Sequence, residues 1–124
     1  MAIDKKFIDQ FVNVTSKAAI ASSFLVGKKD KIAADKAAVD SMRSELNNME
    51  MKGQIVIGEG ELDEAPMLYI GEKLGTKNGP EFDIAVDPLE GTNFAANNLP
   101  GALSVIAIAA VSYTHLTLPT ILLV

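Results

Sequence analysis

The chain has 124 residues, 48% of them hydrophobic, which is enough for the core of one small domain. Its formal net charge is −5, and the acidic residues gather in the middle of the chain, which argues against nucleic acid as a partner and for cations. The chain contains no cysteine, which excludes disulfides and thiolate metal sites and suits the cytoplasm. No signal peptide opens the sequence, and its longest apolar run, residues 102–111, is shorter than the roughly 20 residues of a membrane span.

Two helices are expected at the start of the chain. Apolar residues recur at helical spacing over residues 4–26, and Gly27 ends the pattern. Asp30 can cap a second helix over residues 31–49, in which Lys31 and Asp35 lie four residues apart. From this spacing alone, a surface ion pair worth at most about 0.5 kcal/mol is the favoured interpretation of Lys31 and Asp35.

An acidic loop follows the first expected strand. Residues 54–57 read as a short buried strand, and residues 58–66 then place four carboxylates within six positions, at Glu59, Glu61, Asp63 and Glu64. These carboxylates repel one another unless water solvates them or cations neutralise them, so a solvated acidic turn is the alternative to a cation site. The spacing is not that of an EF-hand. Residues 65–75 then predict a helix capped by glycine, and residues 76–81 a polar turn.

A second acidic motif follows the next strand. Residues 81–86 predict a strand that should stop near Asp87, because Pro88 cannot donate a backbone hydrogen bond. Asp87 and Glu90 should then lie on a tight loop, where Gly91 allows the backbone to approach a ligand closely. Thr92 should open the next helix, whose free N–H groups favour an anion such as phosphate. Two carboxylates, a hydroxyl and a helix start together suit a hard cation that holds a phosphate.

The last expected elements are a helical turn or two over residues 93–98 and a strand over residues 102–111. The order is therefore helix, helix, strand, helix, strand, strand. This order predicts an α/β fold, more specifically an α+β layered sandwich in which helices pack on a mixed β-sheet.

Two stretches resemble a known family. The run Asp87-Pro88-Leu89-Glu90-Gly91-Thr92 is similar to the Asp-Pro-hydrophobic-acidic-Gly-Ser/Thr signature of the metal-dependent, lithium-sensitive phosphatase superfamily. Together with residues 55–72, it closely resembles class II fructose-1,6-bisphosphatase of bacteria, and the likeness covers about residues 5–110. The resemblance implies hydrolysis of a sugar bisphosphate substrate, fructose 1,6-bisphosphate, to fructose 6-phosphate and phosphate in gluconeogenesis, with Mg²⁺ or Mn²⁺ as cofactor.

The resemblance also implies a set of site residues. It places metal ligands at Asp35, Glu59, Asp87 and Glu90, and sugar-phosphate contacts at Glu90, Gly91 and Thr92. Lys31 and Asp63 fall on active-site positions of the family, and Thr92 with Asp35 would orient the attacking water. This makes the surface ion pair of Lys31 and Asp35 the less favoured interpretation.

The likeness fails after Val111. We expect residues 1–111 to be a partial N-terminal phosphatase domain, and residues 112–124 to be a tail foreign to the family, from a translated sequencing adapter or a frame shift. His115, the only histidine, lies in that tail and receives no catalytic role. The full-length enzyme is expected to be a homo-oligomer and the truncated chain to be inactive. The alternatives are a sedoheptulose-bisphosphatase or inositol-phosphatase relative, or a non-catalytic cation-binding module.

Overall fold

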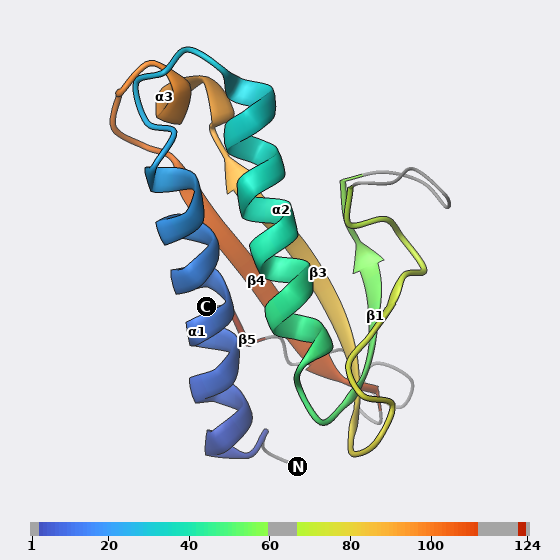
Figure 1. The fold of residues 1–124 in the computed structure, drawn as a ribbon. Coiled ribbons are helices and arrows are strands. Elements are labelled where there is room, and N and C mark those ends of the chain that lie inside the picture. The colour runs from blue at the N-terminus through green and yellow to red at the C-terminus, as the bar shows by residue number, and fades with distance from the viewer. Residues whose placement is uncertain (1–2, 60–66, 112–121, 124) are drawn as a thin grey trace.

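A computed structural model describes residues 3–59, 67–111 and 122–123 of the chain. In chain order these form α1 (Lys5–Ser23), α2 (Lys31–Asn47), β1 (Lys52–Ile57), β2 (Lys73–Leu74), β3 (Glu81–Glu90), α3 (Thr92–Ala96), β4 (Leu103–Ala110) and β5 (Leu122–Leu123). The strands join in one sheet in the order β2-β1-β3-β4-β5, in which β1 and β3 run parallel and the other neighbours antiparallel. Helices α1 and α2 lie side by side across one face of this sheet (Figure 1). The predicted α+β arrangement of helices on a mixed sheet is thus confirmed.

Capping fixes where α1 and α2 begin. Asp4 accepts a hydrogen bond from the backbone N–H of Lys6, and Asp30 accepts one from that of Ala33, so each aspartate satisfies a free donor of the first helical turn. The predicted cap at Asp30 is confirmed. Helix α1 ends at Ser23 and α2 at Asn47, two or three residues earlier than the apolar patterns predict.

The core lies between the two long helices and the sheet. Phe7 and Phe11 of α1 meet Phe82 of β3 edge to face, with ring centroids 5.2 and 5.6 Å apart. Met42 and Leu46 of α2 are fully buried in the same cluster. The apolar stripe of α2 predicted its core face, but that of α1 also included Val12, which is 44% exposed, and left out Val14, which is buried.

Strand β3 does not stop where the sequence predicts. It continues through Pro88 to Glu90, and its pairing with β4 shifts register between Asp87 and Glu90. Such an irregularity is a position at which a strand tolerates proline, because the ladder bond that proline cannot make is already missing there. Asp87 and Glu90 consequently lie at an irregular strand end rather than on a separate loop.

The helix predicted over residues 65–75 is wrong for every residue of it that the structure describes. Residues 67–74, which we call the return segment, run back along β1 as turns and end in the short strand β2. Gly71 and Gly75 adopt φ of +95° and +100°, which glycine reaches without strain but a continuing helix does not allow. Gly75, which was expected to cap the helix, instead follows strand β2, and Gly71 lies in a turn.

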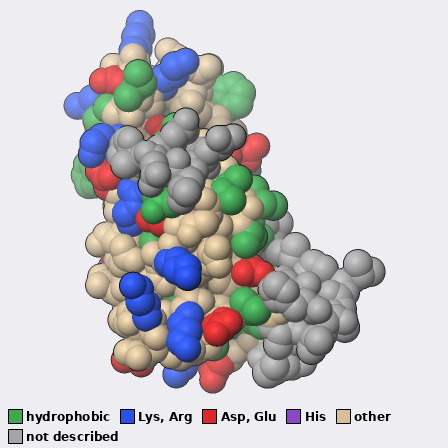
Figure 2. Space-filling model, turned by 90° about the vertical axis from the view of Figure 1, so that its right-hand side faces the viewer, with side chains coloured by type: hydrophobic (Ala, Val, Ile, Leu, Met, Phe, Trp, Pro, Cys, Tyr) green, Lys and Arg blue, Asp and Glu red, His purple; other side chains and the backbone are tan. Residues whose placement is uncertain are grey.

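The end of β1 is more exposed than a buried strand should be. Val56 and Ile57 are 43% and 64% exposed. Figure 2 views the molecule from this side, where hydrophobic side chains reach the surface among charged ones. The apolar run at residues 55–57 therefore marked a strand correctly but not its burial. Among the described helices, none is long and apolar enough to cross a membrane.

Candidate metal and phosphate site

One pocket gathers most of the residues singled out by the two acidic motifs. Its volume is about 460 Å³, and its polar lining comes from the start of α2, the end of β1 and the β3–α3 junction. Because β1 and β3 are parallel neighbours, their carboxyl ends meet at the same edge of the sheet and bring the two motifs together. The polar side chains that line the pocket belong to Lys31, Asp35, Glu59, Asp87, Glu90 and Thr92.

The β3–α3 junction has the backbone geometry that its sequence suggests. Gly91 has a left-handed φ of +77° and precedes Thr92, the first residue of α3. A Cβ atom at Gly91 would lie 2.9 Å from the ring of Phe94, so this position has neither the conformation nor the room for a side chain. The backbone N–H of Leu89 faces the Asp87 carboxylate and acts to lower its pKa, against the larger effects of burial and of neighbouring charges.

Electrostatic crowding raises the pKa of three carboxyl groups in this pocket. Burial, and then the charges of Asp35 and Asp87, raise the pKa of Glu59 to about 7. Burial also raises the pKa of Asp35, although its hydrogen bond with Glu59 acts in the opposite direction. The pKa of Asp87 is raised by burial and by the charges of Glu90 and Asp35. These carboxyl groups therefore hold protons more tightly than isolated ones do, and a cation would relieve the same repulsion.

The donor set fits a hard divalent cation. One oxygen of Glu59, Oε2, is buried and has no hydrogen-bond partner, so it is an acceptor with nothing to accept. Carboxylate oxygens are the ligands that Mg²⁺ and Mn²⁺ prefer. Within the described ranges, however, no three acidic or histidine side chains come close enough together to form a ready-made metal-binding group. The pocket therefore supplies the ligand types, but its described residues do not form a ready-made metal-binding group.

The predicted site residues can be followed one at a time. Lys31 and Asp35 both line the pocket, and no ion pair joins them in the part of the chain that the structure covers, so the surface-pair interpretation is not supported. Asp63 lies outside the described residues. Sequence reasoning did not expect the apolar lining by Ile32, Met67 and Leu89. Leu89 is the hydrophobic position of the Asp-Pro motif and Met67 lies in the second matching stretch, so their place in these motifs was the available signal.

Comparison with known proteins identifies the family. The family model for bacterial fructose-1,6-bisphosphatase, glpX-encoded, matches residues 5–121. A D-fructose 1,6-bisphosphatase class 2/sedoheptulose 1,7-bisphosphatase of Prochlorococcus marinus (strain MIT 9515) is 54% identical over 105 residues, which are 85% of this chain and 32% of that protein. The protein of the same name from Synechococcus sp. (strain CC9311) is 53% identical over 105 residues, covering 85% of this chain and 31% of the relative.

The fold has a counterpart among solved structures. An extragenic suppressor from Pyrococcus furiosus superposes with a TM-score of 0.55 at 16% identity, covering 84% of this chain and 40% of that one, which supports the fold alone. The chain is thus an α+β domain in which helices pack on a mixed sheet and a carboxylate-lined pocket lies at one edge of that sheet. The chain belongs to the glpX-encoded bacterial fructose-1,6-bisphosphatase family, and it spans about a third of the length of the curated relatives that it matches.

Proposed function

We propose that this chain carries the cation- and phosphate-binding part of a phosphatase that hydrolyses fructose 1,6-bisphosphate to fructose 6-phosphate and phosphate. The observation that carries the proposal is the single pocket lined by Asp35, Glu59, Asp87, Glu90 and Thr92. The names of the relatives support the substrate class. The remaining two thirds of such a protein would complete the sugar pocket, and we extend the proposal to a cytoplasmic, homo-oligomeric enzyme in gluconeogenesis.

Each residue receives a role that its position allows. Asp35, Glu59, Asp87 and Glu90 would hold the cations through their carboxylate oxygens. Gly91, which has no side chain in the way, lets the backbone approach the phosphate beside Glu90 and Thr92. Thr92 and Asp35 would orient the water that attacks phosphorus, with Lys31 at the rim of the pocket and Asp63 supplied by the acidic loop.

When bound, Mg²⁺ or Mn²⁺ supplies charge that neutralises phosphate oxygens and lowers the pKa of water. The described residues include no histidine or cysteine that could act as a nucleophile, which supports direct attack by water on the phosphate ester. We also propose that residues 112–124 contribute nothing to this chemistry and that residues 1–111 form the phosphatase part.

The test is a chimera in which the 105 matched residues of this chain replace the corresponding residues of the Prochlorococcus protein. With Mg²⁺ or Mn²⁺ it should release phosphate from fructose 1,6-bisphosphate, and Asp87→Ala should lower kcat/KM by about 10²- to 10³-fold, because a charge worth several kcal/mol is lost. Asp83→Ala, four residues earlier on β3 and outside the pocket, is the matched control and should retain activity. Equal activity of the two variants would refute the assignment.

The name of the relatives supports a second substrate, sedoheptulose 1,7-bisphosphate. The same chimera, tested with both bisphosphates and with an inositol phosphate, separates the substrate alternatives. Cation binding without turnover of any of the three would support the non-catalytic module instead. The 124-residue chain alone should bind a cation but show no significant turnover, since proximity and orientation of the sugar are absent.

A further inference from the structure

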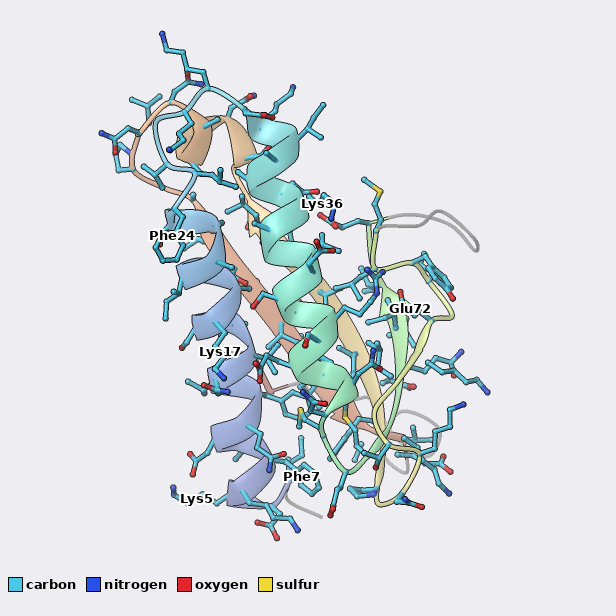
Figure 3. All side chains as sticks on the ribbon, viewed as in Figure 1. Lys5, Phe7, Lys17, Phe24, Lys36 and Glu72 are labelled. Atoms are coloured by element: carbon cyan, nitrogen blue, oxygen red, sulfur yellow. The ribbon has the colours of Figure 1, made fainter. Side chains whose placement is uncertain are left out.

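The return segment carries a partly buried ion pair that the proposed chemistry does not use. Arg43 of α2 donates from Nε to Glu72 Oε2 at 2.8 Å and from Nη2 to Glu72 Oε1 at 3.0 Å, the two-pronged geometry in which a guanidinium fork binds a carboxylate most firmly. Nη2 of Arg43 also donates to the carbonyl oxygen of Met67. Glu72 is 7% exposed, and Figure 3 labels it beside α2. One side chain of α2 therefore binds both ends of residues 67–72.

The same segment holds Glu59 in place through its backbone. The Glu59 N–H donates to the carbonyl oxygen of Leu68 at 2.9 Å. Two further bonds join the segment to β1, from Ile55 N–H to Glu72 O at 2.9 Å and from Gly71 N–H to Ile55 O at 2.8 Å. Arg43 binds Met67, the residue before Leu68, and Glu72, which bonds to Ile55. It therefore fixes the backbone segment to which the Glu59 N–H is hydrogen-bonded.

Close packing makes the position of Glu59 depend on this segment. A Cβ atom at Gly58 would lie 2.4 Å from the Leu68 carbonyl oxygen, so the backbone just before Glu59 rests directly on the return segment. Met67 lines the pocket together with Glu59 and Asp35. Asp35 and Arg43 are eight residues apart on one helix, about 12 Å along its axis. Helix α2 thus contributes Asp35 to the pocket and, through Arg43, also binds the return segment that holds Glu59.

We propose that Arg43 and Glu72 are positioning residues that hold Glu59 against Asp35 in the carboxylate pocket. They act through the return segment and touch neither cation nor substrate. The functional consequence rests on the proposed cation site, but the positioning itself does not. An outer residue that orients a ligand typically changes metal affinity by about 10- to 100-fold.

The test uses the 124-residue chain and amide hydrogen exchange measured residue by residue. The variant pair Arg43→Met with Glu72→Met removes both charges and so avoids leaving one buried alone. We expect the Glu59 and Gly71 amides to exchange at least ten times faster, while the amides of Phe11 and Val14 in α1 keep their rates. Lys17→Met, which removes the ion pair between Lys17 and Glu45 at 3.1 Å, is the matched control and should leave Glu59 unchanged.

Two further variants sharpen the result. Arg43→Lys keeps the charge but loses the fork, and should speed Glu59 exchange by less than the double variant does; it carries the test if the double variant does not fold. Gly58→Ala should reproduce the effect by pushing on the Leu68 carbonyl. Unchanged Glu59 exchange in a folded variant, or equal acceleration of α1 amides, overturns the proposal.

A Mn²⁺ titration of the same variants separates this inference from the proposed function. Mn²⁺ should bind the double variant about 10- to 100-fold more weakly than the unmodified chain, and Glu59→Gln should mark the site by weakening binding as well. If the unmodified chain binds no Mn²⁺ while Glu59 exchange responds as described, the proposed cation site fails and the positioning role stands. If the double variant binds Mn²⁺ as tightly as the unmodified chain does, the functional part of the inference is wrong.

Discussion

The helix-covered half of the sheet and the return segment are held by different forces. Helices α1 and α2 rest on β3 and β4 through a continuous apolar cluster, with Phe11, Met42, Ile84 and Ile106 fully buried. The return segment buries only Leu68 and Leu74 completely, exposes half of Ile70, and depends on hydrogen bonds and the pair of Arg43 and Glu72. Apolar packing spreads its free energy over many contacts, whereas an ion pair concentrates it in one geometry. The helix-covered half of the sheet should therefore tolerate most single substitutions, whereas the return segment that positions Glu59 should not tolerate the loss of its ion pair.

The largest expected effect comes from the apolar half. Phe11→Ala should lower the free energy of unfolding by about 3–5 kcal/mol, because it leaves a cavity beside Phe82 that the core cannot fill. Phe24→Ala is the matched control: Phe24 is 73% exposed and directly follows α1 (Figure 3). It should change stability by less than about 0.5 kcal/mol. Urea unfolding followed by circular dichroism measures both, and similar losses would contradict the packing described here.

The second-largest expected effect comes from the ion pair of the return segment. A double-mutant cycle on Arg43 and Glu72 should give a coupling energy of about 1–3 kcal/mol, since Glu72 is largely removed from water. The same cycle on Lys17 and Glu45, whose side chains are 51% and 25% exposed, should give less than about 1 kcal/mol. Chemical denaturation of the unmodified chain and the six variants gives both values. Coupling energies of equal size would show that the pair of Arg43 and Glu72 contributes no more than the surface pair of Lys17 and Glu45.

The pocket itself should make stability depend on pH. In the folded chain the pKa of Glu59 is raised from 4.5 to about 7, so the folded state holds this proton more tightly than the unfolded state does. Deprotonation of Glu59 therefore lowers the free energy of unfolding. This loss is small below pH 4.5, grows as the pH rises and is complete above about pH 7. Glu59→Gln should therefore stabilise the chain by about 1–2 kcal/mol more at pH 8 than at pH 5, after allowance for solvent screening.

Thermal unfolding at the two pH values measures this difference, and Glu81→Gln, an exposed carboxylate at the start of β3, is the control. Adding Mg²⁺ at pH 8 should raise the melting temperature of the unmodified chain more than that of Glu59→Gln. If the stability difference between Glu59→Gln and the unmodified chain is the same at pH 5 and pH 8, the pKa of Glu59 is not raised in the folded pocket.

The smallest effect compares one glycine from each region. Gly91 and Gly71 both have positive φ, so alanine at either should cost about 1–2 kcal/mol for the left-handed conformation. At Gly91 the new Cβ would also press on Phe94 at 2.9 Å, whereas nothing lies within 4 Å at Gly71. Gly91→Ala should thus be the more destabilising by about 0.5–1 kcal/mol in the same unfolding measurement. The reverse order would mean that the β3–α3 junction is less tightly packed than the return segment.

The sequence by itself determined the local elements whose signals are dense. The cap at Asp30, the helical spacing of apolar residues in α1 and α2, and the apolar run of β4 can each be recognised within a short stretch of sequence. The family resemblance also named polar residues, among them Asp35, Glu59 and Asp87, that line one pocket, while their roles stay a prediction. Such signals are read from neighbours in the chain, so they need no knowledge of the fold.

Only the tertiary structure decided what distant contacts impose. The short, glycine-interrupted stretch at residues 67–75 has a pattern compatible with a helix, but its backbone groups find partners on β1 and its Glu72 finds Arg43, 29 residues away. Pairing with β4 likewise carries β3 past Pro88, because the bulge removes the bond that proline lacks. The parallel pairing of β1 and β3 brings Glu59 beside Asp87, since strands that run in the same direction end at the same edge of the sheet.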